Sequence, residues 1–313
     1  MKNKDNKENI LERIKEKAVE SVSIADLTDS SISGFRFFRR NEPTSPQCCF
    51  YKPMAILVLQ GKKQTNLGSE AFTYTAGQCV VAGVDIPSAG RIIEATPEKP
   101  FLTLIVELNR QLIAELLPNV PNADNITMSE RGMGIMTADE NLLNAFERLL
   151  DIEATPEKHK VMAPMILKEI HYILLTSPLG NLLRSVYTQG THGNQIAQAI
   201  TWLRENYKQP LKISELAQRV NMTESTFYRH FNKVTSLSPI QYQKRLRLYE
   251  AQRLMLTDNE DAGVAGYMVG YDNEAQFSRE YKRMFGLPPK SHIRQIEKTN
   301  YANRKNAIPF HTK

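Results

Sequence analysis

The chain has 313 residues, of which 41% are hydrophobic, so it is long and apolar enough for two packed domains. Its net charge of +6 is unevenly spread: residues 194–297 contain 15 Lys or Arg against 11 Asp or Glu, whereas residues 1–193 contain 21 against 23. The sequence begins with charged residues, has no run of about eighteen apolar residues and contains only three cysteines. These features argue against a secreted, membrane-spanning or disulfide-linked protein, so we expect a cytoplasmic one.

Short apolar runs alternate with glycine or proline over the first third of the chain, at a spacing of about ten residues. This rhythm predicts an antiparallel barrel or sandwich over residues 31–108. A hairpin turn is expected at Leu67–Glu70, because Gly68 accepts the positive φ that a two-residue turn requires. The expected strands are Ile32–Arg40, Ala55–Leu59, Lys63–Leu67, Ala71–Tyr74, Cys79–Val81, Arg91–Glu94 and Leu102–Glu107.

The apolar period becomes helical after Asn109. Pro164 precedes or interrupts one of the helices expected there. The composition of Gln189–Gly193 predicts a flexible linker, so an N-terminal domain would span residues 1–190. The expected helices are Asn109–Leu117, Asp139–Ile152, His159–Leu175 and Leu179–Tyr187.

Residues 213–233 have the pattern of a helix-turn-helix unit. Ile213–Val220 predicts a short supporting helix, because Leu216 and Val220 are four residues apart and so lie on one face. Asn221–Thr223 then supplies a turn and an N-cap. A second helix is expected over Glu224–Lys233.

A similar unit follows about fifty residues later. Asp261–Val269 predicts its supporting helix, and Gly270–Asp272 its turn. The second helix is expected over Asn273–Phe285, and Gly286–Pro289 ends it.

A capped helix connects the two units. Ser238 is an N-cap, Pro239 occupies the first helical position, and Gln241 completes a capping box. The helical pattern continues to Met255, which gives a spacer of about 27 Å at roughly 1.5 Å per residue. Such a spacer could hold two recognition helices near the ~34 Å repeat of B-DNA.

The second helices of the two units share an aromatic and an arginine at matching places, in Thr226–Phe231 and Gln276–Tyr281. An arginine fork can donate two hydrogen bonds to the O6 and N7 edge of guanine in the major groove. Basic side chains elsewhere would position the phosphate backbone. The expected base contacts are Ser225, Thr226, Tyr228, Arg229, Glu274, Ser278 and Arg279, and the expected backbone contacts are Lys233, Lys244, Arg247 and Lys282.

These residues carry a resemblance to the AraC/XylS transcription regulators that covers about a hundred residues. The motifs of the carboxyl half that resemble the family signature are Leu237–Pro239, Val269–Tyr271, Phe277–Arg283 and Phe285–Gly286. The motifs of the amino half that are similar to the AraC-type N-terminal regulatory domain are Tyr51–Pro53, Leu59–Lys63, Tyr74–Gln78 and Ala95–Pro100.

The resemblance implies an α+β protein: an N-terminal cupin-like antiparallel β-barrel with flanking helices (residues 109–188), and a C-terminal all-α tandem helix-turn-helix domain over residues 194–297, followed by a basic tail over 298–313. It implies a sequence-specific DNA-binding transcription regulator, an activator, controlled by an unidentified small-molecule effector at the barrel. Its partners would be double-stranded DNA and RNA polymerase. The flanking helices often pair subunits in such regulators, which leaves a homodimer open.

The second helix-turn-helix unit departs from the family pattern at Gly263 and Gly266, where alanine is usual. Glycine weakens a helix by about 1 kcal/mol relative to alanine. We therefore expect the second unit to be the less stable one.

Two other functions stay open. A cupin-type barrel enzyme with an accessory helical domain would hold a metal with barrel histidines, but the first histidine is His159, so we expect no enzyme, no metal and no cofactor. Gly132–Gly134 also lacks the Gly-Lys-Ser of a phosphate loop. A helical adaptor that binds protein instead of DNA would show no salt dependence of binding to a duplex.

Three cysteines, Cys48, Cys49 and Cys79, are effector or redox candidates, because a thiolate near Lys52 or near Arg39 and Arg40 could react with electrophiles or oxidants. The alternative, which we favour, is burial as small apolar side chains. Gln60–Lys63 could likewise meet an anionic ligand, although a charge pair beside a hairpin is more often a solvated edge.

Overall fold

The computed structural model describes residues 2–22, 27–68, 70–121 and 131–306, with the backbone alone at residues 2–5 and 299–306. The chain divides into two compact units: Met1–Gln198 with Ser225–Ser236, and Ala199–Glu224 with Leu237–Lys313. This division follows contacts, and the domain boundaries expected from the sequence stay a prediction. In the described part of the chain, no helix combines the length and hydrophobicity needed to cross a membrane.

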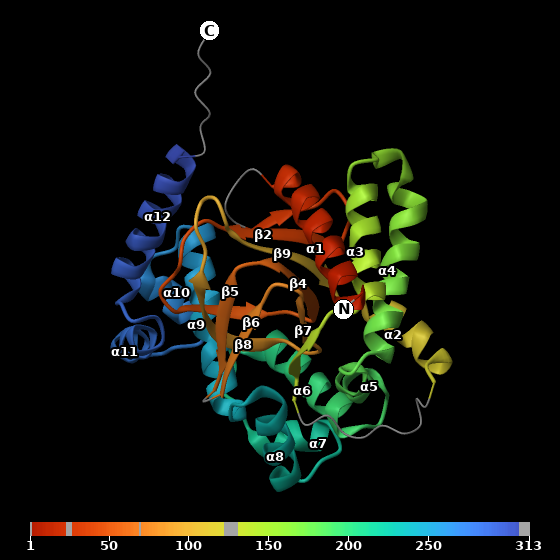
Figure 1. The fold of residues 1–313 in the computed structure, drawn as a ribbon. Coiled ribbons are helices and arrows are strands. Elements are labelled where there is room, and N and C mark those ends of the chain that lie inside the picture. The colour runs from red at the N-terminus through yellow and green to blue at the C-terminus, as the bar shows by residue number, and fades with distance from the viewer. Residues whose placement is uncertain (1, 23–26, 69, 122–130, 307–313) are drawn as a thin grey trace. The chain divides into compact units, whose positions relative to one another are not determined.

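Two antiparallel sheets form the centre of the first unit (Figure 1). The six-stranded sheet has the order β1-β2-β9-β4-β7-β10, and the four-stranded sheet has the order β3-β8-β5-β6. The strands are β1 Leu27–Asp29, β2 Phe35–Arg40, β3 Gln47–Tyr51, β4 Met54–Gln60, β5 Lys62–Leu67, β6 Glu70–Thr75, β7 Gln78–Ala82, β8 Ile86–Glu94, β9 Phe101–Glu107 and β10 Met133–Thr137.

All seven expected strands are confirmed, and the hairpin register pairs Leu67 with Glu70 beyond Gly68, whose φ is 57°. Three strands lacked a clear sequence signal. β1 is only three residues long, β3 contains two cysteines and a glutamine, and β10 lies among helices in the sequence. β3 and β10 become strands by pairing with distant neighbours, β8 and β7, whereas β1 pairs with β2, the next strand along the chain.

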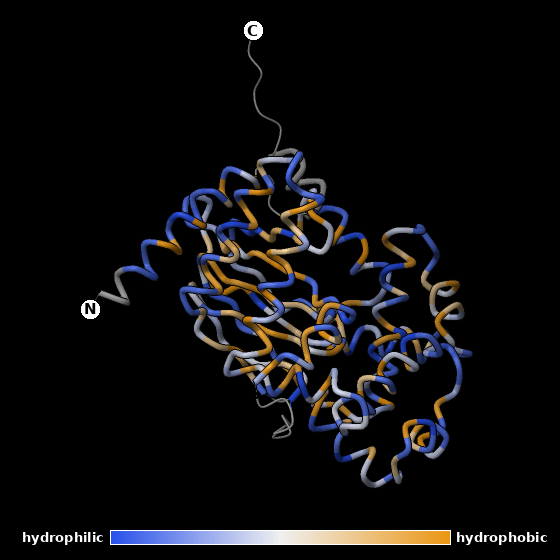
Figure 2. The backbone as a smooth tube through the Cα atoms, turned by 90° about the vertical axis from the view of Figure 1, so that its right-hand side faces the viewer, coloured by the Kyte–Doolittle hydropathy of each residue, from blue (hydrophilic) through white to orange (hydrophobic). Residues whose placement is uncertain are grey.

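Side chains on the six-stranded sheet alternate between two environments, because successive residues of a strand point to opposite faces. On β9, Leu102, Leu104 and Val106 belong to the main hydrophobic core together with the helices. Phe101 and Thr103 on the same strand line a cavity instead. In Figure 2 the hydrophobic stretches gather in the strands, whereas the helices show alternating hydrophobic and hydrophilic turns.

Helices cover the core face of this sheet, and α3 lies between α1 and α4 (Figure 1). The helices expected after Asn109 are confirmed, with Asn109 and Asp139 as N-caps and Pro164 inside α4. The helices of this unit are α1 Lys2–Ser21, α2 Arg110–Leu116, α3 Glu140–Glu153, α4 His159–Thr176, α5 Gly180–Tyr187 and α8 Glu224–Thr235, with 3-10 turns at Leu117–Asn119 and Pro156–Lys158.

The first helix, α1, had no counterpart in the sequence prediction. It buries Ile10, Ile14 and Ala18 in the core, and these residues recur at four-residue spacing on one face. Its polar face binds α3 through Glu147, which accepts two hydrogen bonds from Arg13 at 2.9 Å. These bonds lower the pKa of the Glu147 carboxyl.

The second half of the expected linker Gln189–Gly193 is ordered helix, because α6 (His192–Asn206) already begins at His192. Gly193 lies so close to α5 that a Cβ there would come within 2.5 Å of the Ser185 carbonyl oxygen. Asn194 also donates a 2.9 Å hydrogen bond to the Val186 carbonyl. Prediction of a flexible linker from composition was wrong here, because close packing onto α5 requires the small residue.

The second unit consists of helices. The capping box of Ser238 and Gln241 is present at the start of α9, and Gly286 ends α11 in the left-handed conformation with φ 83°. The remaining helices are α7 Ile213–Arg219, α9 Pro239–Thr257, α10 Ala262–Met268, α11 Glu274–Phe285 and α12 Pro289–Asn306. α12 continues past residue 297 into the expected basic tail.

Gly266 of α10 has a packing role that the sequence prediction missed. A Cβ at this position would lie 2.9 Å from the ring of Phe277, which is fully buried. Glycine therefore lets α10 approach α11 closely, and this contact offsets its weak helix propensity.

Replacement of Ile14 by alanine should lower the free energy of unfolding by about 2–5 kcal/mol, because it leaves a cavity beneath α1. Val19 lies on the same helix and is 39% exposed, so Val19→Ala serves as the matched control with a small effect. Urea unfolding of the full chain, followed by hydrogen exchange in α1 and α3, measures both. Equal destabilisation by the two changes would contradict the assigned packing of α1.

Candidate DNA interface and ligand pocket

The helix α8 has one buried and one exposed face. Phe227 and Phe231 are fully buried and four residues apart. Tyr228 and Arg229 are exposed, and Arg229 makes no ion pair within the described part of the chain. Of the other expected contacts on this helix, Ser225 is exposed, and Thr226 and Lys233 are half-buried.

The helix α11 repeats this arrangement in the second unit. Phe277 and Tyr281 are fully buried, and their rings contact each other at 5.6 Å between centroids. Arg279 is exposed and has no ion pair among the described residues. Of the other expected contacts on α11, Glu274 and Lys282 are exposed and Ser278 is half-buried.

Two expected phosphate contacts on α9 have internal partners. The Lys244 ammonium forms a 2.7 Å ion pair with Glu280 of α11. The other Glu280 oxygen accepts a 2.9 Å hydrogen bond from the Tyr271 hydroxyl. Arg247 donates hydrogen bonds to backbone carbonyls from all three of its guanidinium nitrogens, and basic character alone does not reveal such partners. Its expected phosphate contact stays a prediction.

Arg247 ties three segments of the second unit together. Its guanidinium donates to the carbonyls of Tyr207, Lys208 and Gln209 at 2.7, 3.0 and 3.0 Å. These carbonyls directly follow the C-terminus of α6, where a positive charge is favourable. A fourth bond of 2.8 Å reaches the carbonyl of Gly270, in the turn before α11.

Gly270 makes this approach possible. Its φ is 93°, and a Cβ there would lie 2.3 Å from the Lys208 carbonyl oxygen. The turn can therefore touch the end of α6 only with glycine at this position. Arg247 and Gly270 together fix α11 relative to α9 and α6.

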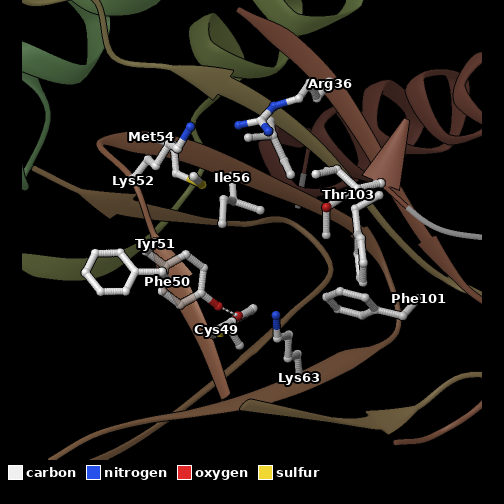
Figure 3. Close-up of a pocket in the computed structure, with 14 residues that line it drawn as sticks. Arg36, Cys49, Phe50, Tyr51, Lys52, Met54, Ile56, Lys63, Phe101 and Thr103 are labelled. Carbon is white, nitrogen blue, oxygen red and sulfur yellow. Dashed lines mark hydrogen bonds between the residues drawn. The ribbon is translucent and has the colours of Figure 1, made fainter. Parts of the chain in front are cut away.

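A cavity of about 230 Å³ lies between the two sheets of the first unit (Figure 3). Its walls come from β1 to β6 and β9, at positions that face away from the helical core. The lining residues are Leu27, Arg36, Phe38, Cys49, Phe50, Tyr51, Lys52, Met54, Ile56, Lys63, Tyr74, Phe101, Thr103 and Ile105.

Lys62 and Lys63 are neighbours on β5 with opposite orientations. Lys62 is at the surface and pairs with Glu94. Lys63 points into the cavity (Figure 3), with its ammonium 5.7 Å from the Phe38 ring centroid and 5.5 Å from that of Tyr51. The solvated-edge interpretation of Gln60–Lys63 therefore holds for Lys62 and fails for Lys63.

The Lys63 amine carries its proton at neutral pH. Burial opposes the charged form, but the negative charge that Tyr51, Tyr74 and Cys49 would carry when ionised raises the pKa of Lys63. Burial raises the pKa of Tyr51 well above its ordinary value, so this phenol is neutral at neutral pH and is no anionic partner for the ammonium. The two phenols are held in place by a closed set of hydrogen bonds with Thr65, at 2.8 to 3.1 Å.

The three cysteines have different environments. None of the three forms a disulfide within the described part of the chain. Cys79 is in the core, and burial raises the pKa of its thiol to about 12. Cys49 lines the cavity, 2.9 Å from the Ser88 hydroxyl, and Cys48 is half-buried. Cys79 is thus a small apolar core residue, and Cys49 is the cysteine with access to the cavity. Within the described residues, no three His, Cys, Asp or Glu side chains gather as a metal site.

Two family models match the chain. Residues 31–182 match the AraC-type transcriptional regulator N-terminus, and residues 216–295 match a helix-turn-helix domain. The first range contains the cavity, and the second contains α8 and α11.

Curated relatives match different lengths of the chain. The HTH-type transcriptional activator RhaS of Pectobacterium carotovorum is 26% identical over 104 residues, which are 33% of this chain and 37% of that protein. The lactose operon transcription activator of Staphylococcus xylosus is 21% identical over 242 residues, or 76% of this chain and 82% of that protein. The chain therefore spans little more than a third of RhaS and most of the second relative.

Among solved structures, ToxT from Vibrio cholerae, with an unsaturated fatty acid bound, is similar in fold. The TM-score is 0.58 at 11% sequence identity, over 85% of this chain and 96% of ToxT. At this identity the similarity concerns the fold alone.

Replacement of Arg247 by lysine should lower the free energy of unfolding by about 1–3 kcal/mol, because an ammonium cannot bond carbonyls on two separate segments as the fork does. Arg253→Lys is the matched control on α9, since Arg253 makes only exposed ion pairs, with Glu250 and Asp258, and such pairs contribute little to stability. Urea unfolding measures both. If Arg247→Lys retained full stability, the bonds of Arg247 to backbone carbonyls would not be what holds these segments together.

Proposed function

We propose, given that this chain belongs to the AraC family of transcriptional regulators, that it is a sequence-specific DNA-binding transcription activator. One observation carries the proposal: α8 and α11 each bury two aromatic residues four positions apart and expose the arginine midway between them, Arg229 or Arg279. This is the arrangement that recognition helices need, since the buried aromatics hold the helix while the arginine meets a base edge.

The base contacts that we assign are Arg229 on α8 and Arg279 on α11, assisted by their exposed or half-buried neighbours. Lys282 is the phosphate contact on α11, because it is exposed and makes no ion pair in the described chain. Lys244 can contact a phosphate only after breaking its ion pair with Glu280. The length of α9, 19 residues or about 28 Å, suits two helices in successive major grooves.

A small-molecule effector would bind in the cavity of the first unit and control DNA binding by the helix-turn-helix modules. The cavity is concave, largely apolar and has a few polar groups, which is typical of ligand sites. That ToxT, which shares the fold, was solved with an unsaturated fatty acid supports a ligand in this class of protein.

An activator acts on RNA polymerase, so this enzyme is the protein partner that the function requires. A second copy of the chain is a further partner, because two copies would contact two half-sites of one operator. Size-exclusion chromatography with light scattering, with and without a duplex, tests the second copy.

Substitution of Arg229 by alanine should weaken binding to a duplex selected from a random pool by about 1–3 kcal/mol, and relax the preference at one base pair. Fluorescence anisotropy with the selected duplex and its single-base variants measures both effects. Equal losses on selected and random duplexes would remove Arg229 from base recognition.

Lys282→Ala should weaken all duplexes alike and reduce the slope of log K against log salt by about 1, because it removes one phosphate contact. Arg253→Ala is the control, because its exposed charge already pairs with acidic neighbours. Titrations at several salt concentrations give the slopes. An unchanged slope for Lys282→Ala would place that side chain away from the phosphates.

A further inference from the structure

The cavity between the sheets lacks the side chains that bind sugars or cations. None of its fourteen lining residues is Asp, Glu, Asn, Gln or His. Hydroxyl-rich or cationic ligands need such acceptors, and here only the hydroxyls of Thr103 and the two tyrosines could accept. A ligand of this cavity must therefore bring its own acceptors.

Lys63 brings a positive charge into the cavity. Lys63 forms no ion pair with a carboxylate in the described part of the chain, and its ammonium lies between aromatic rings (Figure 3). A charge removed from water is costly unless it is paired, and cation–π contacts offset only part of that cost. An anion beside Lys63 would complete the site.

A single anionic group is enough. Two other cations line the cavity: Lys52, which is exposed to solvent, and Arg36, which lies at the end opposite to Lys63 and already forms a 2.7 Å ion pair with Glu107 (Figure 3). Its buried Nε has no hydrogen-bond partner among the described residues, so it can donate one further bond to a ligand. Between the two ends the walls are apolar, with Ile56, Phe101 and Ile105.

We infer that the cavity binds a small organic monocarboxylate, with its carboxylate on Lys63 and its apolar body between Phe38, Ile56 and Phe101. This inference rests on the proposed role of the cavity as the effector site. The volume of about 230 Å³ is below the roughly 300–1,000 Å³ of drug-sized sites, which favours a body the size of one ring or a short chain.

The test compares carboxylates with neutral and cationic molecules of the same shape. Benzoate is compared with benzyl alcohol and benzylamine, and hexanoate with 1-hexanol, by thermal shift and calorimetric titration of the full chain. At least one carboxylate should bind about tenfold or more tightly than its alcohol, and benzylamine should not bind. An alcohol that equals its carboxylate in both pairs overturns the inference.

Variants of the two adjacent lysines locate the site. Lys63→Met should weaken carboxylate binding about 10- to 100-fold, because it removes a charge-assisted bond, while binding of the alcohol is retained. Lys62→Met is the matched control at the surface of the same strand and should bind as the unchanged protein does. Carboxylate binding that survives in Lys63→Met, or is lost in Lys62→Met, overturns the assignment.

The melting temperature of the ligand-free chain tests the site independently of the choice of ligand. Lys63→Met should raise the melting temperature of the ligand-free chain by about 2–4 °C, because an apolar side chain replaces an unpaired buried charge. A lowered melting temperature together with no carboxylate preference rejects the site.

Binding of the selected duplex is measured on the same preparations. Duplex binding without any carboxylate preference would sink the ligand class and leave the regulator proposal standing. Carboxylate binding at Lys63 without any duplex binding would support the ligand class and contradict the regulator proposal.

Discussion

The two-residue period of β-strands is the constraint on which the first unit depends. On β2, β4 and β9 of the six-stranded sheet, one set of side chains packs against the helices, and the alternate set faces the cavity. The same period on β5 sends Lys62 to the surface and Lys63 inward. A slip of one residue would exchange core and cavity, so the hydrophobic pattern that fixes the register also fixes the chemistry of the pocket.

In the second unit, a single arginine has the corresponding importance. Arg247 bonds carbonyls after α6 and in the turn before α11, and Gly270 leaves the space that this contact needs. Lys244, Glu280 and Tyr271 add a second connection between α9 and α11. Bonds to backbone groups hold a helix without using the side chains that it exposes. Arg279 of α11 is therefore exposed without taking part in these connections.

Much of the fold could be predicted from the sequence, because strand and helix periods, caps and turn glycines are local signals. These signals located β2 and the strands β4 to β9, the capped helix α9 and the aromatic faces of α8 and α11. They missed α1 and β3, whose structure depends on distant partners, and they misjudged Gly193 and Gly266, whose small size serves close packing. Local composition carries no information on such neighbours.

The sequence by itself indicated the resemblance to the AraC family, and it determined the buried aromatic faces of α8 and α11 and the exposure of Arg229 and Arg279, because these follow from period and motif. Only the tertiary structure decided the fate of individual charges. Arg247 and Lys63 are basic residues in ordinary sequence surroundings, yet one is bonded to carbonyls and the other is enclosed in an apolar cavity. The reason is physical: the partner and solvation of a charge depend on chain segments that meet only when the protein folds.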